Sequence, residues 1–414
     1  MKDVRDHIRS IPRMDSHYCQ SKSTKEYTEG GKSIADLHRD YLTFCEEPNK
    51  LHANYMMYAT IFKEEFSIYF LVPKKDICHC CEGFRKAKEE ENVTLQERYN
   101  RHIEEKELCR LDKESHKMCL DKVVTVFDLQ STLPYPQGES SSFYYVSKLN
   151  VYNFTMYELQ STQAIRFVWH EGLANRGANE IGSCLWHYLE NINTKPTTKL
   201  DVVLYSDNCV GQNKNILIFA LYVHAVSALE NINSITHKFF ITGHTQNEGD
   251  AVHPIVERAA KRFKRTSPIY VPDNYVITNK QVKKHGKIFD FHEMCYTNFF
   301  DMKLLAEDLG VKGVFSNEVG DRVHISGVSV VKTTKDNYGQ LDYKTSYTQE
   351  IFQTAKFLRN KRQPTAFKKV SLKRMYTQKV GVAAKKKESL LSLFNKKSGV
   401  SVMPQYYKDF YQNL

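Results

Sequence analysis

Acidic side chains stand at the ends of two short apolar runs. Residues 123–129 read VVTVFDL and contain Asp128, and residues 201–205 read DVVLY and are followed by SDN, which contains Asp207. Both runs are too short for helices and rich in β-branched residues, so they predict strands that are covered on both faces. Open α/β sheets bind ligands at the carboxyl ends of their strands, and carboxylate oxygens suit Mg²⁺ or Mn²⁺. Asp128 and Asp207 are therefore candidate residues of an active site.

A second polar segment follows the next predicted strand, residues 235–242. It reads GHTQNEGD, contains His244 and Asp250, and precedes a helix with an apolar face. The succession of strand, polar loop, helix, strand and polar loop is the layout of an α/β active site. Plainer interpretations stay open, because a strand-end aspartate often belongs to a turn, His244 fits a buried structural histidine, and Asp250 fits a helix cap.

A separate group of cysteines and histidines precedes the first strand. The run KKDICHCCEGF contains Cys78 and Cys81, whose two-residue gap lets two thiolates reach one zinc ion. The charged stretch that follows, predicted to be helical, contains His102, His116 and Cys119, and the last two are about one helical turn apart. These five residues are candidate ligands of a structural zinc site. Reduced cysteines without a metal are the alternative, since a second CxxC pair is missing.

The remaining elements near the candidate site follow from the periodicity of apolar residues. This periodicity predicts strands at 144–158 and 164–171 and helices at 178–192 and 214–229. The first of these helices has Glu180 in its first turn, where a negative charge is favourable whether or not it binds a metal. The second helix is preceded by the capping residue Asn213 and is too short to span a bilayer, so no membrane association is expected.

The length of 414 residues exceeds what one compact core usually holds and predicts two or three domains. Helical spacing of apolar residues near 3–11, 33–45 and 51–66 predicts an N-terminal helical domain, either a helix-turn-helix or a lid. The expected division is a helical domain at 1–72, a charged Cys/His connector at 73–122, an α/β core at 123–268, an aromatic β subdomain at 269–350 and a basic C-terminal segment with a terminal helix at 351–414.

The charge is concentrated in one segment. Residues 356–387 contain twelve Lys or Arg and no Asp or Glu, which exceeds the net charge of +11 of the whole chain. Such a segment suits the phosphates of a nucleic acid, and a solvated basic tail or a nuclear import signal fits it equally well. The charged N-terminus lacks an apolar leader, so the ten cysteines indicate a reducing compartment.

The order of strands, helices and acidic residues from Asp128 to Asp250 resembles the ribonuclease H-like fold and the core of DDE-type transposases and integrases. The motifs SDNCVGQNKN, GHTQNEGD and RGANEIGSCL, with HYC near the N-terminus and CHCC before the core, resemble an uncharacterised group of transposable-element-derived proteins. This resemblance covers nearly the whole chain. It implies an α/β fold with a five-stranded mixed sheet flanked by helices.

The resemblance also implies two-metal-ion cleavage or strand transfer of DNA by carboxylates that hold two Mg²⁺ or Mn²⁺ ions. Asp128 and Asp207 would form the bridging pair, because their strands are neighbours in that fold, and Asp250 would be the third ligand, with Glu248 and Glu257 as rivals. Two further residues have expected roles, Glu180 as a fourth carboxylate and His244 as a group that positions water or protonates the leaving group.

These expectations lead to a nuclear, metal-dependent enzyme that processes DNA, with a homo-oligomer on DNA as one expected form. A catalytically idle relative that binds DNA or chromatin is the second hypothesis. Ribonuclease H-like cleavage of a hybrid is the third, favoured by Glu180 and disfavoured by the absence of a recognisable hybrid-binding module.

Overall fold

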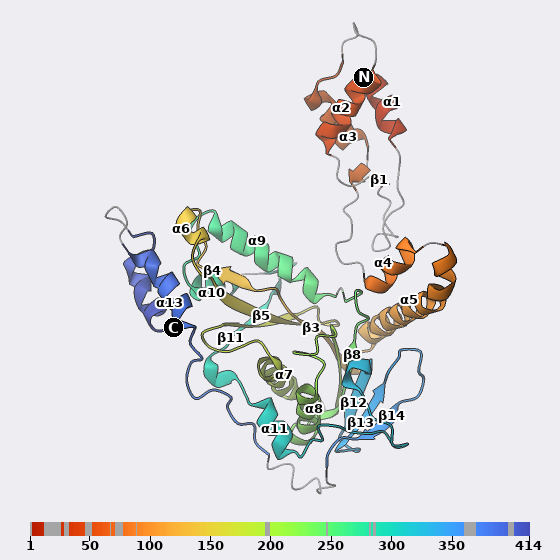
Figure 1. Ribbon diagram of the computed structural model, residues 1–414, viewed down its shortest axis with the longest axis vertical. Coiled ribbons are helices and arrows are strands. Elements are labelled where there is room, and N and C mark those ends of the chain that lie inside the picture. Colours follow the sequence, from red (N-terminus) through yellow and green to blue (C-terminus); the bar gives the residue numbers. More distant parts are fainter. Residues whose placement is uncertain are drawn as a thin grey trace. The chain divides into compact units, whose positions relative to one another are not determined.

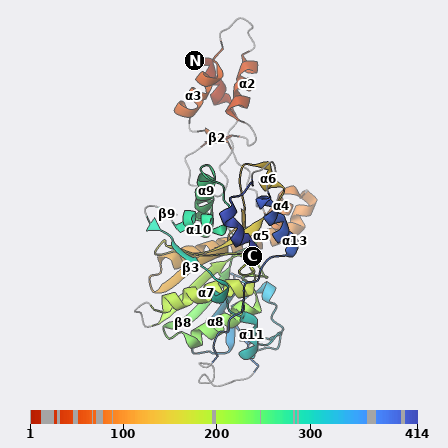
Figure 2. The same ribbon diagram turned by 90° about the vertical axis from the view of Figure 1, so that its left-hand side faces the viewer.

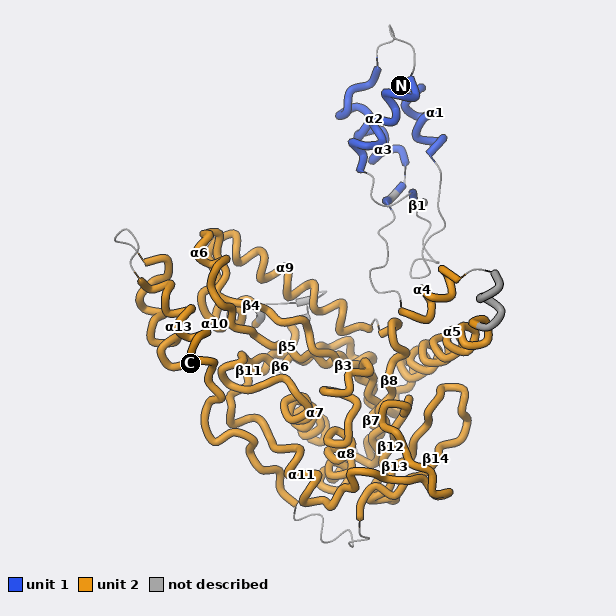
Figure 3. The backbone as a smooth tube through the Cα atoms, in the orientation of Figure 1, with its two compact units in different colours: residues 1–77 blue, residues 78–414 orange. Residues whose placement is uncertain are grey.

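The computed structural model describes residues 2–11, 26–28, 33–45, 52–66, 68–70, 78–87, 89–194, 199–245, 247–280, 283–284, 287–359, 370–395 and 401–414. The HYC motif, residues 195–198 and residues 360–369 of the basic segment lie outside these ranges. The chain forms two compact units, residues 1–77 and 78–414 (Figure 3). Among the described helices, none combines the length and the apolar character that a membrane span requires.

Unit 1 is a small helical unit with its own core. It contains α1 (Lys2–Ser10), β1 (Glu26–Thr28), α2 (Ile34–Phe44), α3 (Tyr55–Glu65) and β2 (Ile68–Phe70), and β1 and β2 pair in parallel. Ser33 and Asp36 form a capping box at the start of α2, and Asn54 caps α3. The three helices agree with the predicted ones. Their buried side chains include Val4, Ile8, Leu37, Tyr41, Tyr58 and Phe62.

Unit 2 is built on a ten-stranded mixed sheet. The path through the sheet is β11, β6, β5, β3, β7, β8, β12, β13 and β14, and β4 pairs with β5 beside it. The strands are β3 (Lys122–Leu129), β4 (Leu133–Tyr135), β5 (Leu149–Glu158), β6 (Ala164–His170), β7 (Leu200–Ser206), β8 (Ile232–Phe239), β11 (Asp290–Glu293), β12 (Val330–Thr334), β13 (Gln340–Lys344) and β14 (Gln353–Lys356). In the centre, β3, β7 and β8 run parallel, whereas β5 is antiparallel to both β3 and β6.

Helices cover both faces of this sheet (Figures 1 and 2). One face packs on α7 (Ala178–Asn193), α8 (Ile216–Ala228) and α11 (Met302–Asp308), and their side chains share a core with strand residues such as Phe154 and Val202. The opposite face packs on α9 (His253–Lys264), α10 (Pro272–Lys280), α13 (Ala384–Leu391) and α14 (Lys408–Gln412). The C-terminal helix packs on the core, and Tyr411 is fully buried there.

A helical hairpin precedes the sheet. It consists of α4 (His79–Lys86) and α5 (Glu89–Met118), and the rings of Phe84 and Tyr99 stack with centroids 4.0 Å apart. The shorter elements of unit 2 are α6 (Ser141–Tyr144), the strand pair β9 (Lys283–Lys284) and β10 (Lys287–Ile288), and 3₁₀ turns at Gly249–Ala251, Tyr296–Asn298, Ile325–Gly327, Ser392–Phe394 and Gln405–Tyr407.

The structure corrects four expectations about unit 2. It has ten strands rather than five, and β12 to β14 extend it through antiparallel pairing of β12 with β8 instead of forming a separate subdomain. The strand predicted at 144–158 begins only at Leu149, because α6 ends at Tyr144 and residues 145–148 form a bend and a short loop. The cap of α8 is Asn215 rather than Asn213, and its Oδ1 accepts hydrogen bonds from two backbone amides of the first turn.

Candidate metal centres

Asp128 and Asp207 lie level with one another at the carboxyl ends of parallel strands. Val126 of β3 pairs with Tyr205 of β7, and two residues further on come Asp128, near the end of β3, and Asp207, directly after β7. Burial, followed by the charges of Asp207 and Asp250, raises the pKa of Asp128 to about 7. The structure therefore brings together the two carboxylates that the sequence predicted as neighbours.

Asp250 reaches the same place from the 3₁₀ turn after β8. One ligand atom each from Asp128, Asp250 and His253 lie within 4.8 Å of one another, a spacing that suits a metal ion. Burial is the main cause that raises the pKa of Asp250, and the backbone amide of Asn247, which donates to its Oδ2 over 2.8 Å, acts against it. Asp207 stands outside this group of three, but its charge acts on Asp128.

His253 is a site residue that the sequence analysis did not single out. Its Nδ1 is 4.0 Å from Oδ2 of Asp128 and 4.0 Å from Oδ1 of Asp250. Burial lowers the pKa of His253 to about 4, so the imidazole is neutral at pH 7 and can offer a lone pair. Two features of the sequence could have indicated His253. It follows Asp250 by three residues, and it precedes Pro254, which marks the start of a helix.

The two rival carboxylates are engaged elsewhere. Glu248 accepts hydrogen bonds from Nζ of Lys113 at 3.1 and 2.9 Å, and Glu257 accepts one from Nε2 of Gln130 at 3.3 Å. Of the three candidates for the third carboxylate, Asp250 is the one that the geometry places beside Asp128.

The loop after β7 closes on Asp207. Its Oδ1 accepts hydrogen bonds from Nδ2 of Asn213 at 2.5 Å and from the amide of Cys209 at 3.1 Å. In the same loop, Nζ of Lys214 donates to Oδ1 of Asn208 over 2.8 Å, and burial lowers the pKa of Lys214 to about 8. The polar residues of the SDNCVGQNKN motif thus hold the Asp207 carboxylate in a defined orientation.

Glu180 caps the start of α7. Its Oε2 accepts a hydrogen bond from the amide of Gly177 at 2.7 Å, which caps α7, and its Oε1 accepts another from Oη of Tyr376. It does not join the carboxylate group among the described residues. This position corresponds to the plainer interpretation, a favourable charge at a helix N-terminus.

Cys78, Cys81, His102 and His244 form a second group, with one ligand atom from each within 4.8 Å of the others. Three of these residues were predicted as zinc ligands, whereas His244 was expected beside the carboxylates. Burial is the main cause that raises the pKa of the Cys81 thiol to about 11. In place of His244, the residue that the structure sets beside Asp128 and Asp250 is His253.

The other two predicted zinc ligands lie at the end of α5 and do not join this group. Nδ1 of His116 is 2.9 Å from the carbonyl oxygen of Asp112 and 3.0 Å from Oη of Tyr205, and Cys119 donates its amide to the carbonyl of His116. His116 and Cys119 are one helical turn apart, as expected, but this turn faces β7 rather than Cys78 and Cys81.

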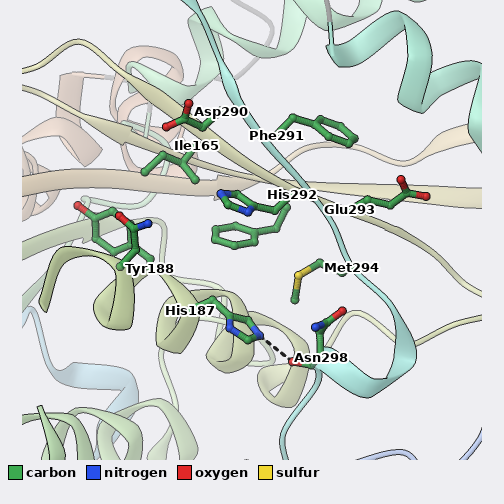
Figure 4. Close-up of a pocket in the computed structure, with 11 residues that line it drawn as sticks. Ile165, His187, Tyr188, Asp290, Phe291, His292, Glu293, Met294 and Asn298 are labelled. Atoms are coloured by element: carbon green, nitrogen blue, oxygen red, sulfur yellow. Dashed lines mark hydrogen bonds between the residues drawn. The ribbon is translucent and has the colours of Figure 1, made fainter. Parts of the chain in front are cut away.

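A pocket of about 410 Å³ lies at the edge of the sheet that ends in β11, between α7 and the strands β6 and β11 (Figure 4). Its lining includes His187 and Tyr188 of α7 and His292 of β11, and Nε2 of His187 is 2.9 Å from the carbonyl oxygen of Asn298. The ring of His292 stacks on Phe167. No lining residue belongs to either metal group, so the pocket is a separate feature of unit 2.

Comparison with known proteins yields one family match. Residues 148–309, from β5 to the end of α11, match a family described as a domain of unknown function (DUF7869). This range contains Asp207, His244, Asp250 and His253 and leaves out Asp128, Cys78, Cys81 and His102. No curated protein matches the chain.

Proposed function

We propose that this chain is a metal-dependent, DNA-processing enzyme of the DDE transposase or integrase type. Asp128, Asp207 and Asp250 would hold two Mg²⁺ or Mn²⁺ ions for phosphodiester cleavage or strand transfer. When bound, such ions activate the attacking oxygen and stabilise the leaving oxygen.

The order of the central strands supports a ribonuclease H-like core. The path β6, β5, β3, β7, β8 has two antiparallel pairs followed by two parallel pairs. The crossovers from β6 to β7 and from β7 to β8 run through α7 and α8, which cover the same face. This succession resembles the arrangement that the sequence motifs implied.

The observation that carries the proposal is the position of the Asp128 carboxylate. It is partly buried, lies beside Asp250, and its pKa is raised to about 7 by burial and by two neighbouring carboxylates. Like charges held this close disfavour their own ionisation, and a divalent cation is the usual partner that relieves the repulsion. His253, neutral and directed at the same two carboxylates, would add a nitrogen ligand or position a water.

The test is nicking of supercoiled DNA in Mn²⁺ or Mg²⁺ by the full chain and by three single variants, Asp128→Asn, Asp207→Asn and Asp250→Asn. Each variant should lose at least about 100-fold in rate, because a two-metal site depends on every bridging or terminal carboxylate. Asp201→Asn is the matched control: Asp201 lies at the opposite end of β7 and accepts hydrogen bonds from Asn233 and Ser234. Nicking that persists in Asp207→Asn would refute the assignment.

One observation favours the second candidate, an idle relative that binds DNA without cutting it. Oδ1 of Asp207 is already occupied by Asn213 and Cys209 of its own loop, which leaves it less available to a metal. Calorimetric titration of the protein with Mn²⁺ distinguishes the two proposed functions. The enzyme should bind Mn²⁺ and lose this binding in Asp128→Asn, whereas an idle protein should show no binding that depends on these aspartates.

A further inference from the structure

The Cys78 group draws its four ligand atoms from three separate segments of unit 2. Cys78 and Cys81 flank the first turn of α4, His102 lies within α5, and His244 lies in the loop after β8. Sγ of Cys78 is 3.1 Å from Nε2 of His102, and Sγ of Cys81 is 3.4 Å from Nε2 of His244. Four side chains that are distant in sequence therefore converge on one point.

The spacing of these atoms is close to that of a tetrahedral zinc site. Zinc binds sulfur at about 2.3 Å and imidazole nitrogen at about 2.0 Å, so neighbouring ligand atoms lie about 3.6 Å apart. Two thiolates would neutralise the charge of the ion, and two imidazoles would complete the shell. Soft sulfur and imidazole donors select zinc over Mg²⁺, which prefers oxygen ligands.

We propose that Cys78, Cys81, His102 and His244 hold one zinc ion that fixes the loop from Phe240 to Asp250 to the α4–α5 hairpin. With four protein ligands the site is closed, and its role is structural rather than catalytic. The proposal does not depend on the proposed DNA-processing activity, because it concerns metal content and the position of a loop.

A glycine in the same loop is a second, independent sign of this attachment. Gly243, which precedes His244, has a φ of +77°, and a Cβ placed on it would lie 2.0 Å from Cβ and 2.7 Å from Cα of Cys78. Only glycine allows so close an approach of the two backbones and this dihedral angle without strain. The loop is thus built to lie directly against the residue that begins the Cys/His group.

The loop contacts α5 beyond the metal group as well. Nζ of Lys113 is 2.9 Å from Glu248 and lies 5.5 Å from the centre of the Phe240 ring. Asp250 follows Glu248 by two residues. Zinc at His244 and the ion pair at Glu248 would therefore hold both ends of the segment that delivers Asp250 to Asp128, which makes the four zinc ligands positioning residues for the carboxylate site.

The test is the zinc content of the full chain, expressed with added zinc and measured by plasma mass spectrometry. Wild type should hold about one zinc per chain, and Cys81→Ser and His244→Asn should fall to near zero, since a site with three ligands binds the ion far more weakly. Cys80→Ser and His116→Asn are the matched controls and should keep the metal: Cys80 stands between the two cysteines without joining the group, and His116 is the other histidine of α5 that the sequence suggested.

Wild-type protein that contains no zinc, or loss of the metal in His116→Asn but not in His244→Asn, would overturn the proposal. If a ligand variant fails to fold, wild-type protein is stripped of metal with a chelator and titrated with Co²⁺ instead. Tetrahedral cobalt bound to thiolate gives intense visible and near-ultraviolet absorption, which should saturate at about one Co²⁺ per chain. Absence of this absorption would also refute the site. Neither measurement uses DNA, so failure here is distinguishable from failure of the proposed enzymatic function.

Discussion

At the scale of single residues, the ionised Asp128 carboxylate lowers the free energy of unfolding of the metal-free protein. Its pKa of about 7 in the fold, against 3.8 for the free side chain, means that folding favours the protonated form. In the unfolded chain the group loses its proton near pH 4, whereas in the fold it keeps the proton up to about pH 7. The unfavourable contribution is therefore absent below pH 4, grows between pH 4 and 7, and is complete above pH 7.

The first prediction follows from this sign. In a chelating buffer, Asp128→Asn should gain stability relative to wild type as pH rises from 4 to 8. The gain should be at most about 4 kcal/mol, because one pKa unit corresponds to about 1.4 kcal/mol. Urea unfolding of both proteins at pH 5 and pH 8 measures it, and Mg²⁺ should restore the stability of wild type at pH 8. Parallel pH profiles for the two proteins would contradict the assignment.

The candidate ligands that the structure brings together as the sequence predicted are those at the end of a strand or in a short local spacing. Asp128 and Asp207 follow apolar strands, and Cys78 and Cys81 share one turn, so local patterns were sufficient. The roles of His244 and His253 could not be obtained in this way. His244 lies in the loop after β8, and His253 begins the helix α9 that follows this loop. Only the packing of α4 and α5 against the loop decides which of the two histidines lies beside the cysteines.

At the scale of elements, several charged side chains of α5 bind the rest of unit 2. Asp112 of α5 binds Nζ of Lys238 at 2.7 and 2.5 Å and accepts a hydrogen bond from Oη of Tyr205 at 2.7 Å. Burial alone would raise the pKa of Asp112, but these partners and His116 hold it well below its ordinary value. Glu105 accepts the amide of Tyr347 at 2.8 Å. The helix is thus attached to the strands through its charges.

The second prediction concerns the start of α7. In Glu180→Gln, one carboxylate oxygen becomes an NH₂ group, which cannot accept a hydrogen bond. Either the backbone amide of Gly177 or the hydroxyl of Tyr376 then loses its acceptor. The free energy of unfolding should fall by about 1 to 3 kcal/mol, because a partly buried donor loses its acceptor. Tyr376→Phe removes the same contact from the other side and should cost about 1 kcal/mol. Urea unfolding measures both changes.

The matching functional measurement distinguishes a structural Glu180 from a metal ligand. Mn²⁺ affinity in Glu180→Gln should stay within about threefold of wild type, since its carboxylate caps a helix and binds Tyr376. A loss of tenfold or more would reinstate the fourth carboxylate that ribonuclease H-like chemistry implied.

Strand alternation and helical spacing located the central strands and the helices α7, α8 and α9 within a few residues, because burial on one face or both leaves a local trace. The extension of the sheet by β12 to β14 left no such trace. The segment Val330–Thr334 pairs with its neighbour β13 on one side and with β8 on the other. The second pairing depends on the exposed edge of β8, which is a property of the assembled sheet.

At the scale of the whole molecule, the two units have separate cores. The buried cluster of unit 1 is drawn from residues 4–70, and both clusters of unit 2 begin at Cys109 or later. All candidate metal ligands belong to residues 78–414. A domain with its own core folds independently in most cases, so removal of unit 1 should leave the chemistry of unit 2 intact.

The third prediction is that a fragment of residues 72–414 folds in one cooperative transition and keeps the Mn²⁺ affinity of the full chain within about threefold, since no ligand is lost. A fragment of residues 88–414 is the matched comparison, because it also lacks α4 with Cys78 and Cys81. It should bind no zinc and should bind Mn²⁺ at least about tenfold more weakly, because the segment that carries Asp250 loses one of its two attachments. Calorimetric titration and thermal unfolding of both fragments provide the measurements. If both fragments bind Mn²⁺ equally well, the zinc group does not position the carboxylates, and if the longer fragment fails to fold, the two units depend on each other.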